Sequence, residues 1–134
     1  MLSYWQKFWR VEILAVLSLL VFSCLVATYL VVENLFQTEP LLGPISVAWL
    51  GWAYAFLVGL FFVNAIGVPA YCAYTEFRWF SMPLLLLVAV TPGVALLFGD
   101  FVFGAVGVIG GLSIALSVDF LAKRWTGIRS AEAA

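Results

Sequence analysis

The sequence predicts an all-α integral membrane protein, a bundle of four transmembrane helices with both termini in the cytoplasm. Hydrophobic residues make up 66% of the 134 residues and charged residues 10%, whereas soluble domains average about 45–50% and about 25%. The mean hydropathy is +1.15. A soluble fold of this size could not bury so much apolar surface. The chain is therefore expected to lie almost entirely within a bilayer.

Four uncharged stretches supply the expected spans, because a helix needs about 20 apolar residues to cross the hydrocarbon core. Together they form one membrane domain, residues 1–134. We expect an amphipathic N-terminal turn at 2–10, spans at about 11–33, 45–68, 80–98 and 101–122, and a short cytoplasmic tail at 123–134. The last two spans are joined by Gly99-Asp100 alone, so they should form an antiparallel hairpin.

Proline positions suggest where the expected helices begin, bend or end. Pro69 should kink or end the second span, because proline lacks an amide donor and clashes with the preceding turn. Residues 70–78 would then lie at the membrane interface, a level that suits Tyr71, Tyr74, Arg78 and the adjoining Trp79. Pro83 falls in the first turn of the third span, where proline is tolerated. Pro92 should kink that span.

The N-terminal turn carries aromatic side chains on one face. Trp5, Phe8 and Trp9 follow helical spacing and are flanked by Lys7 and Arg10. Aromatic and basic residues together are typical of an interfacial amphipathic segment. This turn is expected to anchor the first span at the bilayer surface.

A cleavable signal peptide is the alternative interpretation of the N-terminus. Residues 11–23 would then be its apolar core, and Cys24 would follow a lipoprotein-like cleavage box. Phe22 occupies a position where that box usually has a small residue, and residues 25–32 continue the apolar run. We therefore expect the first helix to be retained.

The positive charges predict the orientation. With four spans, all six Lys and Arg residues share one side, namely Lys7, Arg10, Arg78, Lys123, Arg124 and Arg129. The opposite side holds Glu33, Glu39 and Asp100 without any cation. Under the positive-inside rule, both termini are cytoplasmic. The expected location is a cytoplasmic (inner) membrane, and a bacterial origin is assumed from the compact topology.

Small residues at four-residue spacing are the main candidates for an interface. They are Gly51, Ala55 and Gly59 in the second span, and Gly107, Gly111 and Ala115 in the fourth. Such spacing lets helix backbones approach closely and gain dispersion energy, which is the main packing force in lipid. These two faces are expected to pack against each other within the chain. Alternatively, one of them faces another membrane protein or a second copy.

A few polar residues are candidates for contacts between helices. Glu12 and Asp119 lie at shallow positions, and Asp119 can pair with Lys123 four residues later on the same helix face. Glu12 could reach Arg78 or Arg124 across the bundle. Asn64 is the most polar deep residue of the second span, where it could bond to a neighbouring helix.

The composition argues against an enzyme. The chain has no histidine, which removes the commonest general base and metal ligand. It also lacks the phosphate-binding, dinucleotide-binding, zinc-protease and serine-hydrolase motifs. We expect no catalytic residue, no metal and no cofactor. The net charge of −1 provides no basic field for a nucleic acid.

Three classes of function remain. The leading expectation is a non-catalytic protein that acts through helix–helix contacts as an accessory subunit, assembly factor or immunity-type protein. Its partners would be membrane lipids and another membrane protein or a second copy of itself. The alternative is an oligomeric small transporter or channel, lined by Asn64, Thr91, Ser113 and Ser117. A lipid-handling protein is a weaker third class, based on the aromatic and basic interface.

Overall fold

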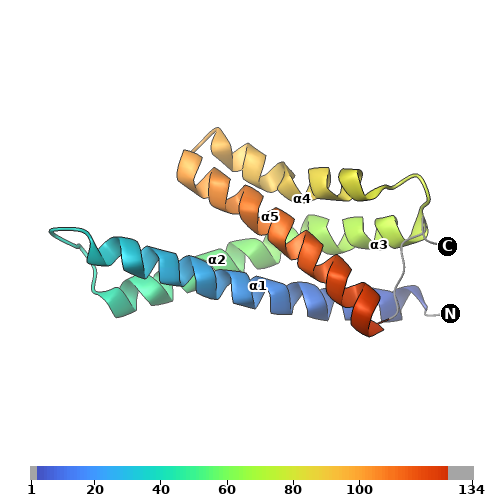
Figure 1. Cartoon of the computed structure of the whole chain (residues 1–134), viewed down its shortest axis with the longest axis horizontal. Coiled ribbons are helices and arrows are strands. Elements are labelled where there is room, and N and C mark those ends of the chain that lie inside the picture. Colours follow the sequence, from blue (N-terminus) through green and yellow to red (C-terminus); the bar gives the residue numbers. More distant parts are fainter. Residues whose placement is uncertain (1–2, 127–134) are drawn as a thin grey trace.

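Helices account for nearly all of the described chain, as the predicted class requires (Figure 1). The structure is a computed structural model and describes residues 3–126. Its elements, in chain order, are α1 (Tyr4–Leu35), α2 (Pro44–Phe62), the π-helical turn η1 (Val63–Gly67), α3 (Val68–Glu76), α4 (Met82–Leu97), α5 (Phe101–Leu121) and the π-helical turn η2 (Ala122–Thr126).

The expected N-terminal turn is the first part of α1 rather than a separate element. Ser3 caps the helix: its Oγ accepts a hydrogen bond from the Gln6 amide at 3.3 Å, and the Gln6 side chain accepts one from the Ser3 amide at 3.1 Å. This reciprocal cap satisfies amide donors that have no partner within the helix. At 32 residues, α1 is about 48 Å long, which exceeds the thickness of a bilayer core.

Pro69 was expected to kink or to end the second span, and the structure rules out the end. Segments α2, η1 and α3 follow one another without a break, so residues 70–76 are helical instead of forming an interface loop. Pro69 lies in the first turn of α3, directly after the π-helical turn. An inserted π turn shifts the hydrogen-bond register. It therefore accommodates the missing amide without ending the helix.

The hairpin formed by α4 and α5 is shorter than the one formed by α1 and α2. Pro83 lies in the first turn of α4 as predicted, and α4 continues through Pro92 to Leu97. Asp100 caps α5 by accepting hydrogen bonds from the Val102 and Phe103 amides at 2.9 and 3.1 Å. Within residues 3–126, three helical segments are long and apolar enough to cross a membrane: Tyr4–Leu35, Pro44–Glu76 and Phe101–Arg124. With 16 residues, α4 is about 24 Å long, which is shorter than the hydrocarbon core of a bilayer. The span expected at 80–98 is therefore not among the three.

The expected tail at 123–134 is described only at its start. Lys123 to Thr126 belong to η2, which continues directly from α5. Residues 127–134 lie outside the described residues.

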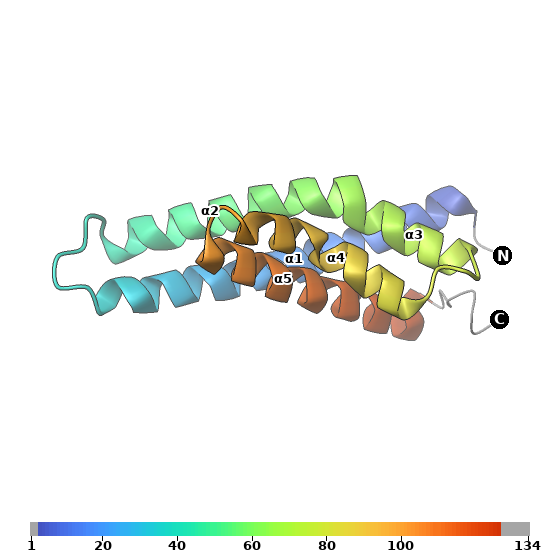
Figure 2. The same cartoon turned by 90° about the horizontal axis from the view of Figure 1, so that it is seen from above.

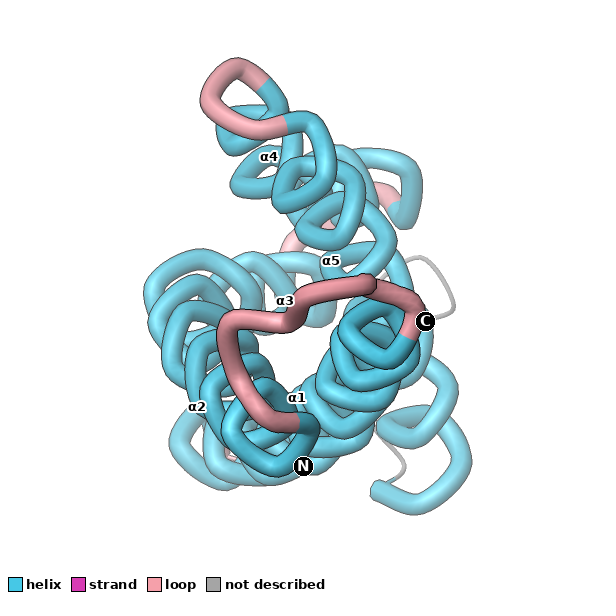
Figure 3. The backbone as a smooth tube through the Cα atoms, turned by 90° about the vertical axis from the view of Figure 1, so that its left-hand side faces the viewer, coloured by secondary structure: helices cyan, strands magenta, loops and turns pink. Residues whose placement is uncertain are grey.

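The helices form two hairpins that meet at one end instead of one closed bundle. Helix α2 packs along α1, and α4 packs along α5. The hairpins contact each other through α1 with α5, α1 with α3, and α3 with α4. Figure 2 shows the turn between α4 and α5 lying well short of the loop between α1 and α2. Seen along the long axis, α4 and α5 lie to one side of α1 and α2 (Figure 3).

The buried core lies where the hairpins meet. Its members come from α1, η1, α3, the segment before α4, α4, α5 and η2, and they are Val11, Leu14, Ala15, Leu19, Val63, Val68, Tyr71, Cys72, Tyr74, Phe80, Leu85, Val118 and Ala122. The start of α1 and the end of α5 are at this same end of the molecule. By contrast, α2 contains no buried residue.

Candidate functional site: the cleft between the hairpins and the outer face of α2

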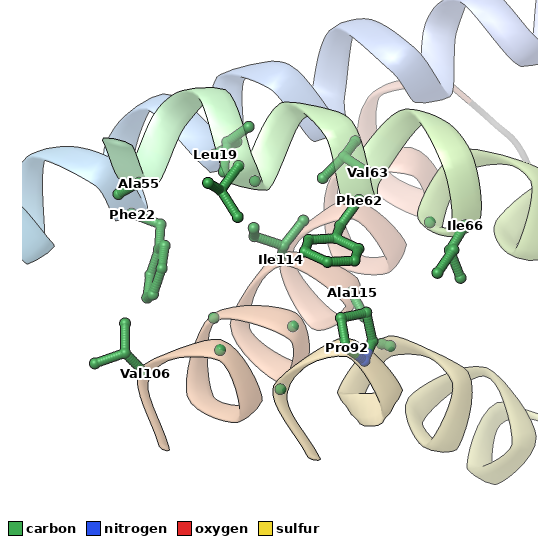
Figure 4. Close-up of a pocket in the computed structure, with 18 of the residues that line it drawn as sticks. Leu19, Phe22, Ala55, Phe62, Val63, Ile66, Pro92, Val106, Ile114 and Ala115 are labelled. Carbon is green, nitrogen blue, oxygen red and sulfur yellow. The ribbon is translucent and has the colours of Figure 1, made fainter. Parts of the chain in front are cut away.

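An apolar cleft separates the two hairpins (Figure 4). We call it the interhairpin cleft. Its volume is about 250 Å³. Leu19 and Phe22 of α1 line it from one hairpin, and Val106 and Ile114 of α5 line it from the other. Among the described residues that line it, only three tyrosines carry a polar side-chain atom, namely Tyr29, Tyr54 and Tyr71. The cleft therefore suits an apolar occupant.

All six predicted small residues line this cleft: Gly51, Ala55, Gly59, Gly107, Gly111 and Ala115. The expectation that the two sets pack against each other is wrong, because α2 packs on α1 and α5 packs on α4. A methyl group at Gly59 would meet Leu19 of α1, and one at Gly111 would overlap the Ala89 carbonyl of α4. Each set therefore allows close packing within its own hairpin, and it also keeps the cleft open.

Gly93 has a packing role that the sequence analysis did not assign. A methyl group there would overlap the backbone of Val108 and Gly107 in α5. Gly93 is buried and lines the cleft. The sequence analysis predicted only a kink at the preceding residue, Pro92. It did not predict that Gly93 is where α4 and α5 approach most closely.

A polar cluster lies at the end of the cleft that is lined by Tyr71 and Val118. The Tyr71 hydroxyl donates a hydrogen bond to Asp119 Oδ1 at 3.2 Å, and Lys123 Nζ donates one to Asp119 Oδ2 at 2.8 Å. Lys123 also lies 6.0 Å from the centre of the Tyr74 ring. The predicted pairing of Asp119 with Lys123 is confirmed. Tyr71 was missed as a partner because Pro69 was expected to leave it outside the helix.

Two other charged side chains of α1 lie near this end. Lys7 Nζ is 2.6 Å from Glu76 Oε1, and this ion pair joins α1 to α3. Glu12 Oε2 is buried and accepts no hydrogen bond. Among the described residues, the expected pairing of Glu12 with an arginine does not occur.

The remaining polar candidates bond within their own helices. Asn64 Nδ2 donates to the Leu60 carbonyl at 2.9 Å, so its expected bond to a neighbouring helix is not formed. The Thr91 hydroxyl likewise donates to the Leu87 carbonyl at 2.9 Å. These side chains, together with Ser113 and Ser117, are exposed on the outside of the chain. Within one copy, they therefore line no common path.

The outer face of α2, meaning the side that does not line the interhairpin cleft, carries a run of neighbouring rings, the last of which, Phe56, packs partly against the buried core. Trp49, Trp52 and Phe56 have ring centres 5.5 and 5.3 Å apart, and the last two rings are nearly parallel. We call these three residues the aromatic ladder. None of them lines the interhairpin cleft. Trp49 and Trp52 instead border a shallow hollow whose other lining residues include Ala27 of α1 and Ala48 of α2.

No metal site is found between residues 3 and 126, where no group of three or more Cys, Asp or Glu side chains is suitably placed. Comparison of the chain with protein-family models, with curated proteins and with solved structures gives no match. Function is therefore inferred from the interhairpin cleft and the aromatic ladder.

Proposed function

We propose that this chain is a small polytopic protein of a bacterial cytoplasmic membrane that acts non-catalytically, through helix–helix contacts with another membrane protein. It would serve as an accessory subunit, assembly factor or immunity-type protein. One observation carries the proposal: α2 is apolar along 19 residues and yet buries none of them within the chain. One side of α2 packs on α1, and exposed residues such as Trp49 and Leu57 leave its other sides available to a partner.

The aromatic ladder is the part of α2 best suited to that contact. Trp49 is 67% exposed, and tryptophans are enriched among the residues that dominate binding energy at interfaces. The neighbouring hollow has alanines beside its tryptophans. Small residues there let another helix approach closely, which favours association in lipid. The ladder together with the hollow thus offers both rigid aromatic area and a place for a partner helix.

Removing the two tryptophans of the ladder should abolish partner binding. Each is expected to contribute about 2 kcal/mol, so the double variant Trp49→Ala, Trp52→Ala should reduce recovery of the partner at least about tenfold. The measurement is purification of the tagged chain in a mild detergent, with co-purifying proteins identified by mass spectrometry and the particle mass determined. The matched control is Trp5→Ala, Trp79→Ala, which removes two tryptophans exposed elsewhere.

A stoichiometric foreign protein that is lost only in the ladder variant would support the proposal. Equal recovery from both double variants would overturn it. A homo-oligomer without a foreign protein, with solute flux from liposomes containing the pure chain, would favour the alternative of an oligomeric transporter or channel.

We further propose that both termini are cytoplasmic. The loop between α1 and α2 and the turn at Asp100 carry only acidic charges, whereas every Lys and Arg within residues 3–126 lies toward the other end of the spans, as the positive-inside rule requires. In a variant lacking Cys24 and Cys72, a cysteine at Glu39 should react with a membrane-impermeant maleimide in spheroplasts. A cysteine at Ser3 should react only after lysis, and the reverse pattern would refute this orientation.

A further inference from the structure

We infer that Tyr54 and Phe103 form a clasp, and that the interhairpin cleft opens by separation of these two rings while its other end stays joined. Tyr54 lies on α2 and Phe103 on α5, and their ring centres are 5.8 Å apart. Both residues line the cleft, and neither belongs to the aromatic ladder. The clasp is therefore separate from the surface that is proposed to meet another protein.

The hairpins touch through side chains at both ends of the cleft. At the end beside the buried core, which we call the joined end, the Tyr71 hydroxyl donates a hydrogen bond to Asp119 Oδ1 at 3.2 Å. Tyr54 lies about 25 Å from Tyr71 along the first hairpin, and Phe103 lies about 24 Å from Asp119 along α5. These similar lengths bring the two rings together at the opposite end of the cleft.

The two contacts differ in how deeply they are buried. Tyr71 belongs to the buried core, and Asp119 is buried as well. Tyr54 is 57% exposed and Phe103 is 52% exposed. A ring pair favours the contacting arrangement by a factor of only about 2–10, whereas separation at the joined end would unpack the core. The clasp is therefore the end that opens.

Each hairpin is packed tightly enough to move as one body. A methyl group at Gly93 would overlap the α5 backbone, and one at Gly59 would meet Leu19 of α1. Between the hairpins, Gly110 of α5 lies against the Phe22 ring of α1, and a glycine has no side chain that could interlock with the ring. The contact between α5 and α1 at this point therefore allows α5 to tilt.

A small tilt is sufficient to open the clasp. Turning an arm of about 24 Å by about 10° displaces its far end by about 4 Å, and helices pack within about 15–20° of their preferred crossing angles. The ring centres, now 5.8 Å apart, would then exceed the roughly 7 Å within which aromatic pairs interact. The hairpins already diverge toward the turn between α4 and α5 (Figure 1).

The chain connection between the hairpins permits this movement. It runs from the end of α3 at Glu76 to the start of α4 at Met82, and Phe80 within it belongs to the buried core. The connection therefore lies at the joined end. Opening at the clasp stretches no part of the chain, because the α1–α2 loop and the α4–α5 turn each stay within one hairpin.

Distances between paired nitroxide labels, measured by double electron–electron resonance, test the clasp on the full chain in detergent micelles. The native cysteines are replaced first. The outer pair of labels is at Leu50 and Phe98, and the joined pair is at Phe77 and Phe120. All four side chains are exposed and none of them lines the cleft. For the wild-type clasp, we expect the outer pair to show mainly a shorter distance and the joined pair to show one narrow distance.

Removing either ring should shift the outer pair toward a longer distance. Tyr54→Ala or Phe103→Ala should raise the ratio of the longer to the shorter distance by about 2–10-fold and leave the joined pair unchanged. Tyr54→Phe retains the ring and should keep the wild-type ratio. The matched control Phe101→Ala removes an exposed ring of α5 that does not line the cleft, and it should have no effect.

Three results would overturn the clasp. The first is an outer-pair ratio that is unchanged in both Tyr54→Ala and Phe103→Ala. The second is an equal shift in Phe101→Ala, since the effect would then not belong to the ring contact. The third is a joined pair that lengthens together with the outer pair, because the hairpins would then separate as a whole. Each result is independent of whether the ladder variants lose a protein partner.

Discussion

Replacing Gly93 with alanine is expected to separate α4 from α5 and to lower the free energy of unfolding by about 3 kcal/mol or more. The added methyl group would overlap backbone atoms of Val108 and Gly107, and backbone cannot move aside as a flexible side chain can. Overpacking of a close-packed contact costs about 1–3 kcal/mol even where side chains can adjust. The measurement is the equilibrium unfolding of the purified chain in mixed detergent micelles.

Gly43→Ala is the matched control for this prediction. A methyl group at Gly43 has no atom within 4 Å, and Gly43 is the N-cap of α2, where alanine is less favourable than glycine, so the same change should cost no more than about 1 kcal/mol. Equal stability of Gly93→Ala and Gly43→Ala would contradict the close backbone contact between α4 and α5.

Replacing Asp119 with leucine is expected to cost about 3 kcal/mol of unfolding free energy. The Asp119 side chain is 12% exposed, and its carboxylate accepts hydrogen bonds from both the Tyr71 hydroxyl and Lys123. Its loss leaves the buried hydroxyl unsatisfied and the ammonium unpaired. Breaking a buried pair costs about 3–5 kcal/mol, and the lower end applies because the Lys123 side chain is 44% exposed. Thermal and denaturant unfolding of the variant measure this loss.

The conservative variant Asp119→Asn separates hydrogen bonding from charge. Its amide oxygen can still accept the Tyr71 hydrogen bond, so we expect it to recover about half of the lost stability. Glu33→Ala, which removes an exposed carboxylate, should be close to neutral. Equal losses for Asp119→Leu and Glu33→Ala would contradict a stabilising role for this cluster.

The helical class, the position of most helices and one ion pair could be predicted from local patterns. The uncharged runs located the helices, and the spacing of Asp119 and Lys123 placed these two residues on one helix face. These features depend on residues that are near each other in sequence. Local chemistry was therefore sufficient to identify them.

Other features depend on contacts that no local pattern contains. Pro69 fails to end the helix because a π turn precedes it, and nothing in the sequence around it signalled that turn. The small-residue faces pack on other neighbours than the expected ones, because their spacing says that a helix can approach and not which one does. The cleft arises from the divergence of two hairpins, which depends on the whole chain.

Site-specific photo-crosslinking tests most directly whether the outer face of α2 meets another membrane protein. A photoreactive amino acid at Trp49 is compared with one at Leu87, which is similarly exposed on α4. In native membranes, we predict a covalent adduct with a foreign membrane protein from position 49 and none from position 87. Adducts with lipid alone at both positions, or an adduct of twice the mass of the chain at position 49, would contradict a foreign partner at this face.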